Sequence, residues 1–176
     1  MTDLDEFRRL AARMPDTVRF GASSWNYPGW RGLVYHQDYE GKGGSARMLR
    51  EYSAFPLFRT VGIDSSFYAP PDERVLRSYA EQLPPGFPCV SKVWNQLTVQ
   101  TFSKAHHKSR GGQVNPDFLS PALFLEAVYQ PYRSWFVGHA GPFVFEFQSI
   151  ARRSGLTPES FASRLDEFFS ALPVEG

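Results

Sequence analysis

The chain has 176 residues, of which 42% are hydrophobic, 21% are charged and 16% are aromatic, and its formal net charge is +1. This length and composition are typical of one globular domain, so we expect residues 1–176 to form a single domain. The near-neutral charge gives no general attraction for nucleic acid or for an anionic membrane, and no apolar run approaches the ~20 residues of a membrane-spanning helix.

The N-terminus and the cysteine content indicate the compartment. The first ten residues, MTDLDEFRRL, are charged and amphipathic, unlike a secretory signal peptide. Cys89 is the only cysteine in the sequence, which excludes an internal disulfide, and its apolar surroundings predict a buried thiol. We therefore expect a cytoplasmic protein.

The first half of the chain alternates helix and strand signals. Apolar residues on one face predict a helix over residues 3–14. The segment VRFGAS is a candidate for the first strand, over residues 18–23. A long loop with several glycines leads to a predicted helix over 45–55. The run TVGID then predicts a strand over 60–64, and a helix follows over 72–82, with Asp72 as its N-cap.

The second half repeats this alternation. PCVSKV predicts a strand over residues 88–93, and a long polar segment over 94–119 follows it. A helix is predicted over 121–135, with Ser120 as its N-cap and an interruption at Pro131. PFVFEFQ predicts the fourth strand over 142–148. The spacing of apolar residues predicts a last helix up to Leu172, with a cap at Thr157.

One helix followed by four strand–loop–helix units predicts an α/β fold with a parallel sheet. A doubly wound sheet typically has a glycine-rich phosphate loop after its first strand, and the sequence contains no GxGxxG or Walker motif. The loops that follow the strands are long and aromatic, whereas those that precede the strands are short. This asymmetry favours TIM-barrel-like construction, in which the loops after the strands form the site.

Several motifs together resemble a known family, the domain of unknown function 72 or YecE-like proteins. The resemblance extends over about residues 19–173, and the matching segments are FGASSW at 20–25, IDSSFY at 63–68, PPGF at 84–87, VSK at 90–92 and GPFVFEFQ at 141–148. It implies a TIM-barrel fold and an activity that is not established. This sequence departs from the family in having Gly62 where an acid is usual. Family members are also longer, so the chain resembles about four of eight units, a half barrel.

Three charged residues lie near the C-terminal ends of consecutive predicted strands: Asp64, Lys92 and Glu146. Because consecutive parallel strands lie side by side, we expect Lys92 between the two carboxylates. One interpretation is a structural layer of ion pairs. The other is a catalytic group, in which Lys92 binds a substrate anion and either carboxylate acts as general base.

Aromatic and polar residues near the same strand ends are candidates for binding a substrate. They are Trp25, Tyr27, Trp30, Ser66, Tyr68, Trp94 and Gln148. The aromatic members either cover the barrel mouth as packing or form a stacking wall for a sugar or a base.

The sequence leaves three functional interpretations open. The first is an enzyme that acts on a small polar molecule, sugar-like or phosphate-bearing. The second is a non-catalytic protein that binds nucleic acid or another ligand through the aromatic residues and a basic loop at 104–110, although the low net charge disfavours nucleic acid. The third is an incomplete, inactive product. We predict no metal site and no cofactor, and we expect a homodimer or other self-association through exposed sheet edges.

Overall fold

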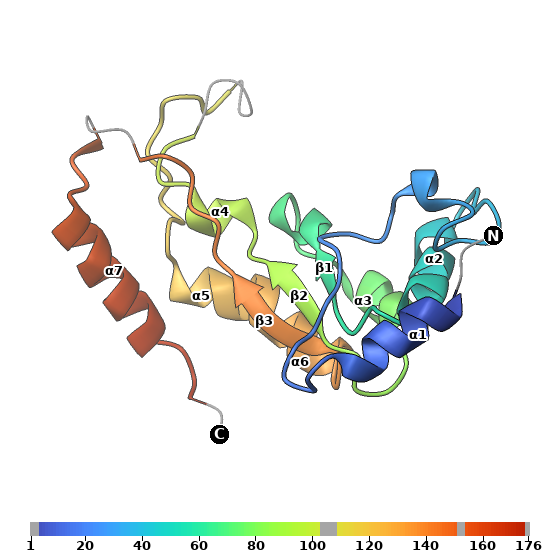
Figure 1. The fold of residues 1–176 in the computed structure, drawn as a ribbon. Coiled ribbons are helices and arrows are strands. Elements are labelled where there is room, and N and C mark those ends of the chain that lie inside the picture. Colours follow the sequence, from blue (N-terminus) through green and yellow to red (C-terminus); the bar gives the residue numbers. More distant parts are fainter. Residues whose placement is uncertain (1–3, 103–108, 151–153, 175–176) are drawn as a thin grey trace.

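The computed structural model describes residues 4–102, 109–150 and 154–174. Figure 1 shows a sheet of three parallel strands in the order β1-β2-β3, with helices against it. The strands are β1 (Val61–Ile63), β2 (Cys89–Lys92) and β3 (Ala140–Val144). The helices are α1 (Leu4–Arg13), α2 (Gly44–Ser53), α3 (Glu73–Ala80), α4 (Asn95–Thr98), α5 (Pro121–Phe124), α6 (Gln130–Trp135) and α7 (Pro158–Ser170). The predicted α/β class with a parallel sheet is confirmed.

The capping signals mark the beginnings of three helices as predicted. The side chains of Asp72, Ser120 and Thr157 accept hydrogen bonds from backbone N–H groups three residues further on, at the starts of α3, α5 and α7. The interruption at Pro131 takes the form of a π turn over Leu125–Tyr129, which joins α5 to α6. The wider turn suits a proline, which has no N–H to donate.

The two faces of the sheet differ strongly in burial. Val61, Ile63 and Cys89 are buried and pack with Leu76 of α3 and Tyr132 of α6. Because successive strand residues point to opposite faces, the intervening positions, which include Lys92, Val144 and Asp64 just beyond β1, lie on the other face. There Val144 is 43% exposed, although it belongs to the sheet. One face therefore forms the core and the other is open.

Two apolar clusters hold the elements together. The first joins β1 to α2 and α3, with Leu49 and Tyr52 of α2 buried in it. The second holds α7 beyond the end of β3: Phe145 packs edge-on against Phe168, with ring centroids 5.4 Å apart, and Phe168 also contacts Phe124 of α5. Side chains continue to point alternately to the two faces after β3, so Phe145 and Phe147 face the helices.

The predicted first strand runs beside β1 without becoming a strand of the sheet. The backbone N–H groups of Arg59 and Gly62 donate to the carbonyl oxygens of Phe20 and Ala22, each at 2.8 Å. These contacts advance in the same direction along both segments, so residues 20–22 run parallel to β1. The prediction of a regular strand over 18–23 is nevertheless wrong, because a side chain interrupts the ladder.

That side chain is Tyr52, which is fully buried. Its hydroxyl accepts a hydrogen bond from the N–H of Ala22 (2.7 Å) and donates to the carbonyl oxygen of Thr60 (3.1 Å). The segment lies so close to β1 that a Cβ on Gly62 would fall 2.4 Å from the carbonyl oxygen of Ser23. This approach explains why glycine occupies the position where the resemblance implies an acid.

Removing the hydroxyl in Tyr52→Phe should lower the free energy of unfolding by about 1–3 kcal/mol, since two backbone groups in the protein interior lose their partner. Urea unfolding followed by circular dichroism measures the change. The matched control is Tyr68→Phe, at a side chain that is 75% exposed, where we expect a change within about 0.5 kcal/mol. Equal stability of the two variants would contradict the bridging role of Tyr52.

Candidate functional site

The structure brings Asp64, Lys92 and Glu146 into contact at one end of the sheet. Lys92 is the last residue of β2, Asp64 directly follows β1, and Glu146 lies two residues beyond β3. The ammonium nitrogen Nζ of Lys92 is 2.8 Å from Oε2 of Glu146 and 3.4 Å from Oδ1 of Asp64. All three side chains are partly exposed on the open face of the sheet, so a molecule from solvent can reach them.

The backbone sets this geometry. The parallel register pairs Ile63 with Ser91 and Lys92 with Val144, which puts the three charged positions on the same face. Ser66 fastens the turn after β1 to β2, because its hydroxyl lies 2.6 Å from the carbonyl oxygen of Lys92. Ser66 is buried, so its side chain supports the site through this contact and is not accessible to a ligand.

The charges around Lys92 keep it protonated. The hydrogen bond to Glu146 and the negative charge of Asp64 raise the pKa of Lys92, and together they outweigh the opposing effect of desolvation. Lys92 is therefore a fixed cation at neutral pH, suited to donating hydrogen bonds and unsuited to acting as a base. Two carboxylates share this one ammonium group, so the site as a whole is acidic in character.

Three of the predicted ligand-binding residues lie within four residues of this group in the sequence, and Trp94 among them packs against the second apolar cluster. Tyr68 is largely exposed and packs edge-on against Phe67, with ring centroids 5.4 Å apart. The ring of Phe67 in turn lies 5.8 Å from Nζ of Lys92. Trp94 follows Lys92 by two residues and is half-buried, and Gln148 follows Glu146 by two residues and is exposed.

The structure places the remaining predicted aromatic residues elsewhere. Trp25 is only 3% exposed and donates a hydrogen bond from Nε1 to the carbonyl oxygen of Ser45 (2.7 Å), so it is a core residue with no free ring face. Trp30 is half-buried and stacks on Tyr52, with ring centroids 6.2 Å apart. Tyr27 is exposed and packs edge-on against Trp30. Trp25 belongs to the first apolar cluster, and Trp30 packs against it.

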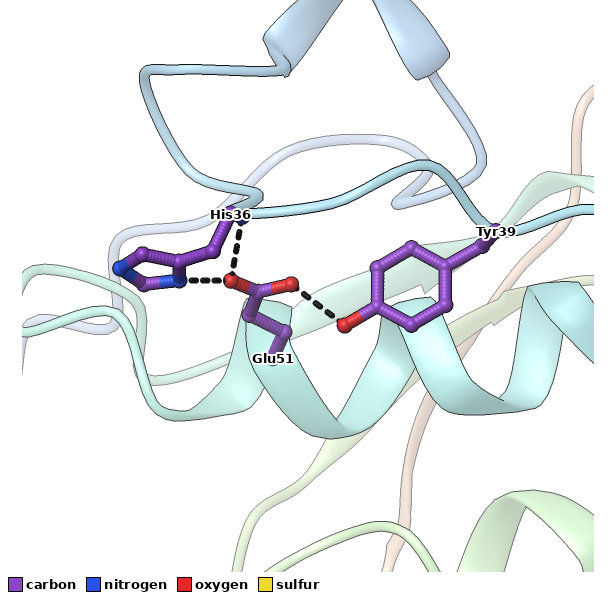
Figure 2. Close-up of polar contacts among 3 residues, drawn as sticks. All are labelled: His36, Tyr39 and Glu51. Carbon is purple, nitrogen blue, oxygen red and sulfur yellow. Dashed lines mark hydrogen bonds and ion pairs between the residues drawn. The ribbon is translucent and has the colours of Figure 1, made fainter.

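A second polar group, which sequence reasoning missed, joins the loop before α2 to the helix itself (Figure 2). Oε1 of Glu51 accepts hydrogen bonds from the backbone N–H (2.6 Å) and Nδ1 of His36, and Oε2 accepts one from the hydroxyl of Tyr39 (2.5 Å). Glu51 is mostly buried. Burial opposes its ionisation, but the hydrogen bonds from Tyr39 and His36 together outweigh burial and lower the pKa of Glu51.

A cavity of about 610 Å³ adjoins this group, between α1, the loop and the C-terminal end of α2. His36 and Glu51 line it together with mainly apolar residues, among them Leu33 and Phe55. No sequence motif marks this arrangement, because His36 and Glu51 are 15 positions apart on a loop and a helix.

The described part of the chain was also searched for metal sites and membrane-spanning helices. Among the residues that the structure describes, no three His, Cys, Asp or Glu side chains are grouped to hold a metal ion. None of the described helices is long and apolar enough to cross a bilayer. Residues 104–108 of the basic loop at 104–110 lie outside the described residues.

Comparisons with known proteins point to one family. The family model described as "Protein of unknown function DUF72" matches residues 19–175. The crystal structure of a DUF72 family protein from Enterococcus faecalis at 3.10 Å resolution superposes with a TM-score of 0.54 at 13% sequence identity, covering 88% of this chain and 48% of that one. This chain thus spans about half the length of that structure. No curated protein matches it.

The contacts of Glu51 predict that replacing its carboxyl group lowers the stability of the fold by an amount that depends on pH. Because the folded-state pKa of Glu51 is lowered, its ionised form stabilises the fold above the unfolded-state value of about 4.5, and this stabilisation is lost as the pH falls through the folded-state pKa. Glu51→Gln should therefore lower the free energy of unfolding by about 1–2 kcal/mol at pH 7. The deficit should shrink as the pH falls below the ordinary carboxyl value of 4.5 and through the lower folded-state pKa.

Urea unfolding at pH 7, 5 and 3.5 measures this difference. Glu73→Gln is the control, because it removes a carboxylate from an exposed ion pair with Arg77 on α3, and it should change stability by less than about 0.5 kcal/mol. A Glu51→Gln deficit that persists unchanged in acid would show that packing, and not charge, accounts for it.

Proposed function

Because the chain belongs to the DUF72 family, whose description assigns no activity, we propose its function from the side chains at the strand ends. In this proposal the protein is an enzyme that binds a small neutral, hydroxyl-rich, sugar-like molecule at the strand ends and acts on it by general acid–base catalysis. The observation that carries this proposal is the contact of one ammonium group, Lys92, with carboxylates from both neighbouring strands. Parallel α/β sheets bind their ligands at this edge.

Each charged residue has a role that its environment supports. Lys92, with its raised pKa, donates hydrogen bonds to a substrate oxygen and stabilises negative charge that develops on it. Asp64 or Glu146 accepts and returns a proton of a substrate hydroxyl, as carboxylates do in general acid–base catalysis. The two carboxylates also accept hydrogen bonds from neighbouring hydroxyl groups.

The balance of charge favours a neutral sugar over a phosphate ester. A phosphate dianion would meet two carboxylates beside the single ammonium group and would be repelled by both. A polyhydroxyl compound instead presents donors to the carboxylates and an apolar ring face to aromatic side chains. In this proposal the exposed ring of Tyr68 and the half-buried ring of Trp94 supply such faces, and Gln148, two residues after Glu146, supplies an amide.

In this proposal the site lies at the mouth of a TIM-barrel-like, YecE-like fold, and the chain supplies about half of that fold. The protein acts in the cytoplasm. The parallel strand–helix order and the coverage of about half of the E. faecalis structure support that arrangement. A purely structural ion-pair layer is the rival interpretation. It predicts that substitutions change stability and leave ligand binding untouched.

Ligand-observed NMR with neutral pentoses and hexoses, and with their phosphate esters, tests the proposal. We expect binding of at least one neutral sugar and at least about tenfold weaker binding to Lys92→Met, since a hydrogen bond from a charged group is lost. Asp64→Asn and Glu146→Gln should keep measurable binding but lose turnover of the bound sugar. Glu73→Gln, which changes an ion pair on α3, is the matched control and should bind as the unaltered protein does.

Two results would contradict the proposal. Unchanged sugar binding by Lys92→Met would show that the strand-end charges do not form the site. Preferential binding of phosphate esters, strengthened by Glu146→Gln, would show that the argument from charge is wrong.

A further inference from the structure

The cavity between α1, the loop and α2 has the size and the lining of a small-molecule site. Its volume of about 610 Å³ lies within the range of roughly 300–1,000 Å³ that ligand pockets occupy. Most of its wall is apolar and includes Leu4 of α1, Leu33 of the loop and Phe55 just after α2. Such a wall binds the apolar part of a ligand by removing it from water.

The charged groups in the wall already have partners. Arg8 forms an ion pair with Asp5 on α1, with 2.6 Å between Nη1 and Oδ1. The two carboxylate oxygens of Glu51 accept hydrogen bonds from His36 and Tyr39. The wall therefore offers little net attraction to an ion, and it favours a neutral ligand.

One ring nitrogen of His36 is accessible to such a ligand. A carboxylate can only accept hydrogen bonds, so Nδ1 of His36 donates to Glu51, and Nε2 of the neutral imidazole is then an acceptor. Figure 2 shows this second nitrogen on the far side of the ring from Glu51. The side chain of His36 is 82% exposed and lines the cavity, while its contact with Glu51 fixes the orientation of the ring.

We propose that this cavity binds a small neutral molecule with an apolar body and a hydroxyl group, such as an alkylphenol, whose hydroxyl donates a hydrogen bond to Nε2 of His36. The apolar wall holds the body of the ligand, and His36 selects for the hydroxyl. Glu51 acts only by holding the ring. The lining residues come from α1, the loop and the end of α2, so the inference does not rest on the function proposed for the strand ends.

Ligand-observed NMR titrations with 4-ethylphenol and with ethylbenzene, which lacks only the hydroxyl, test the inference. We expect the unaltered protein to bind 4-ethylphenol at least about fivefold more tightly than ethylbenzene, the difference that one hydrogen bond makes. His36→Phe keeps an aromatic ring but removes Nε2, so it should bind the two compounds equally. A third probe, 4-ethylbenzoate, carries a negative charge and should bind more weakly than 4-ethylphenol.

Further variants locate the site. Leu33→Trp puts a larger side chain in the cavity wall, at a residue that is 59% exposed, and it should weaken the binding of 4-ethylphenol at least about tenfold because the space is filled. Val137→Trp is the control, at a residue that is 73% exposed in the turn between α6 and β3, and it should bind as the unaltered protein does. Lys92→Met should also bind 4-ethylphenol normally, whatever its effect on sugar binding.

Four results would overturn the inference. They are equal affinity of the unaltered protein for 4-ethylphenol and ethylbenzene, tighter binding of 4-ethylbenzoate than of 4-ethylphenol, unchanged binding of 4-ethylphenol by Leu33→Trp, and no binding of 4-ethylphenol at millimolar concentration.

Discussion

The place of β2 between two parallel neighbours is the constraint on which the rest of the structure depends. Its register with β1 and β3 sends Cys89 and Ser91 into the core and Lys92 to the open face. The same alternation continues past β3, where Phe145 faces α7 and Glu146 faces Lys92. One pairing pattern thus determines both the packing of the helices and the grouping of the charges. A shift by one residue would exchange the two faces and bury the lysine.

Aromatic side chains supply most of the packing that supports this sheet. The chain contains 16 phenylalanines, and several of them lie between the strands and the helices. Rings such as Phe124, Phe143 and Phe145 contact one another edge-on or tilted, the arrangements that aromatic quadrupoles prefer. The aromatic residues near the first loop serve the same purpose. Trp25 is buried in the first apolar cluster and Trp30 packs against it, so the ligand-binding surface that we propose includes neither of them.

The two polar groups differ in what surrounds them. Lys92 and its carboxylates lie at the strand ends and are partly exposed to solvent. Glu51 is mostly buried, and its hydrogen bonds with Tyr39 and His36 hold the loop to α2. A carboxylate engaged by three donors has little capacity left for a ligand. The first group is therefore the one for which we propose chemistry, whereas the contacts of the second hold the loop to α2.

Local sequence patterns determined the elements that local physics controls. Proline and capping residues placed the helix starts at Asp72, Ser120 and Thr157, and strand alternation put Asp64, Lys92 and Glu146 on one face, because both signals act over a few residues. Tertiary structure decided what depends on distant partners. The N–H of Ala22 donates its hydrogen bond to the hydroxyl of Tyr52 instead of to a strand carbonyl, so residues 18–23 do not form a strand of the sheet. Likewise His36 and Glu51 met only through folding, since no local pattern encodes a contact between positions that only the packing of a loop on a helix brings together.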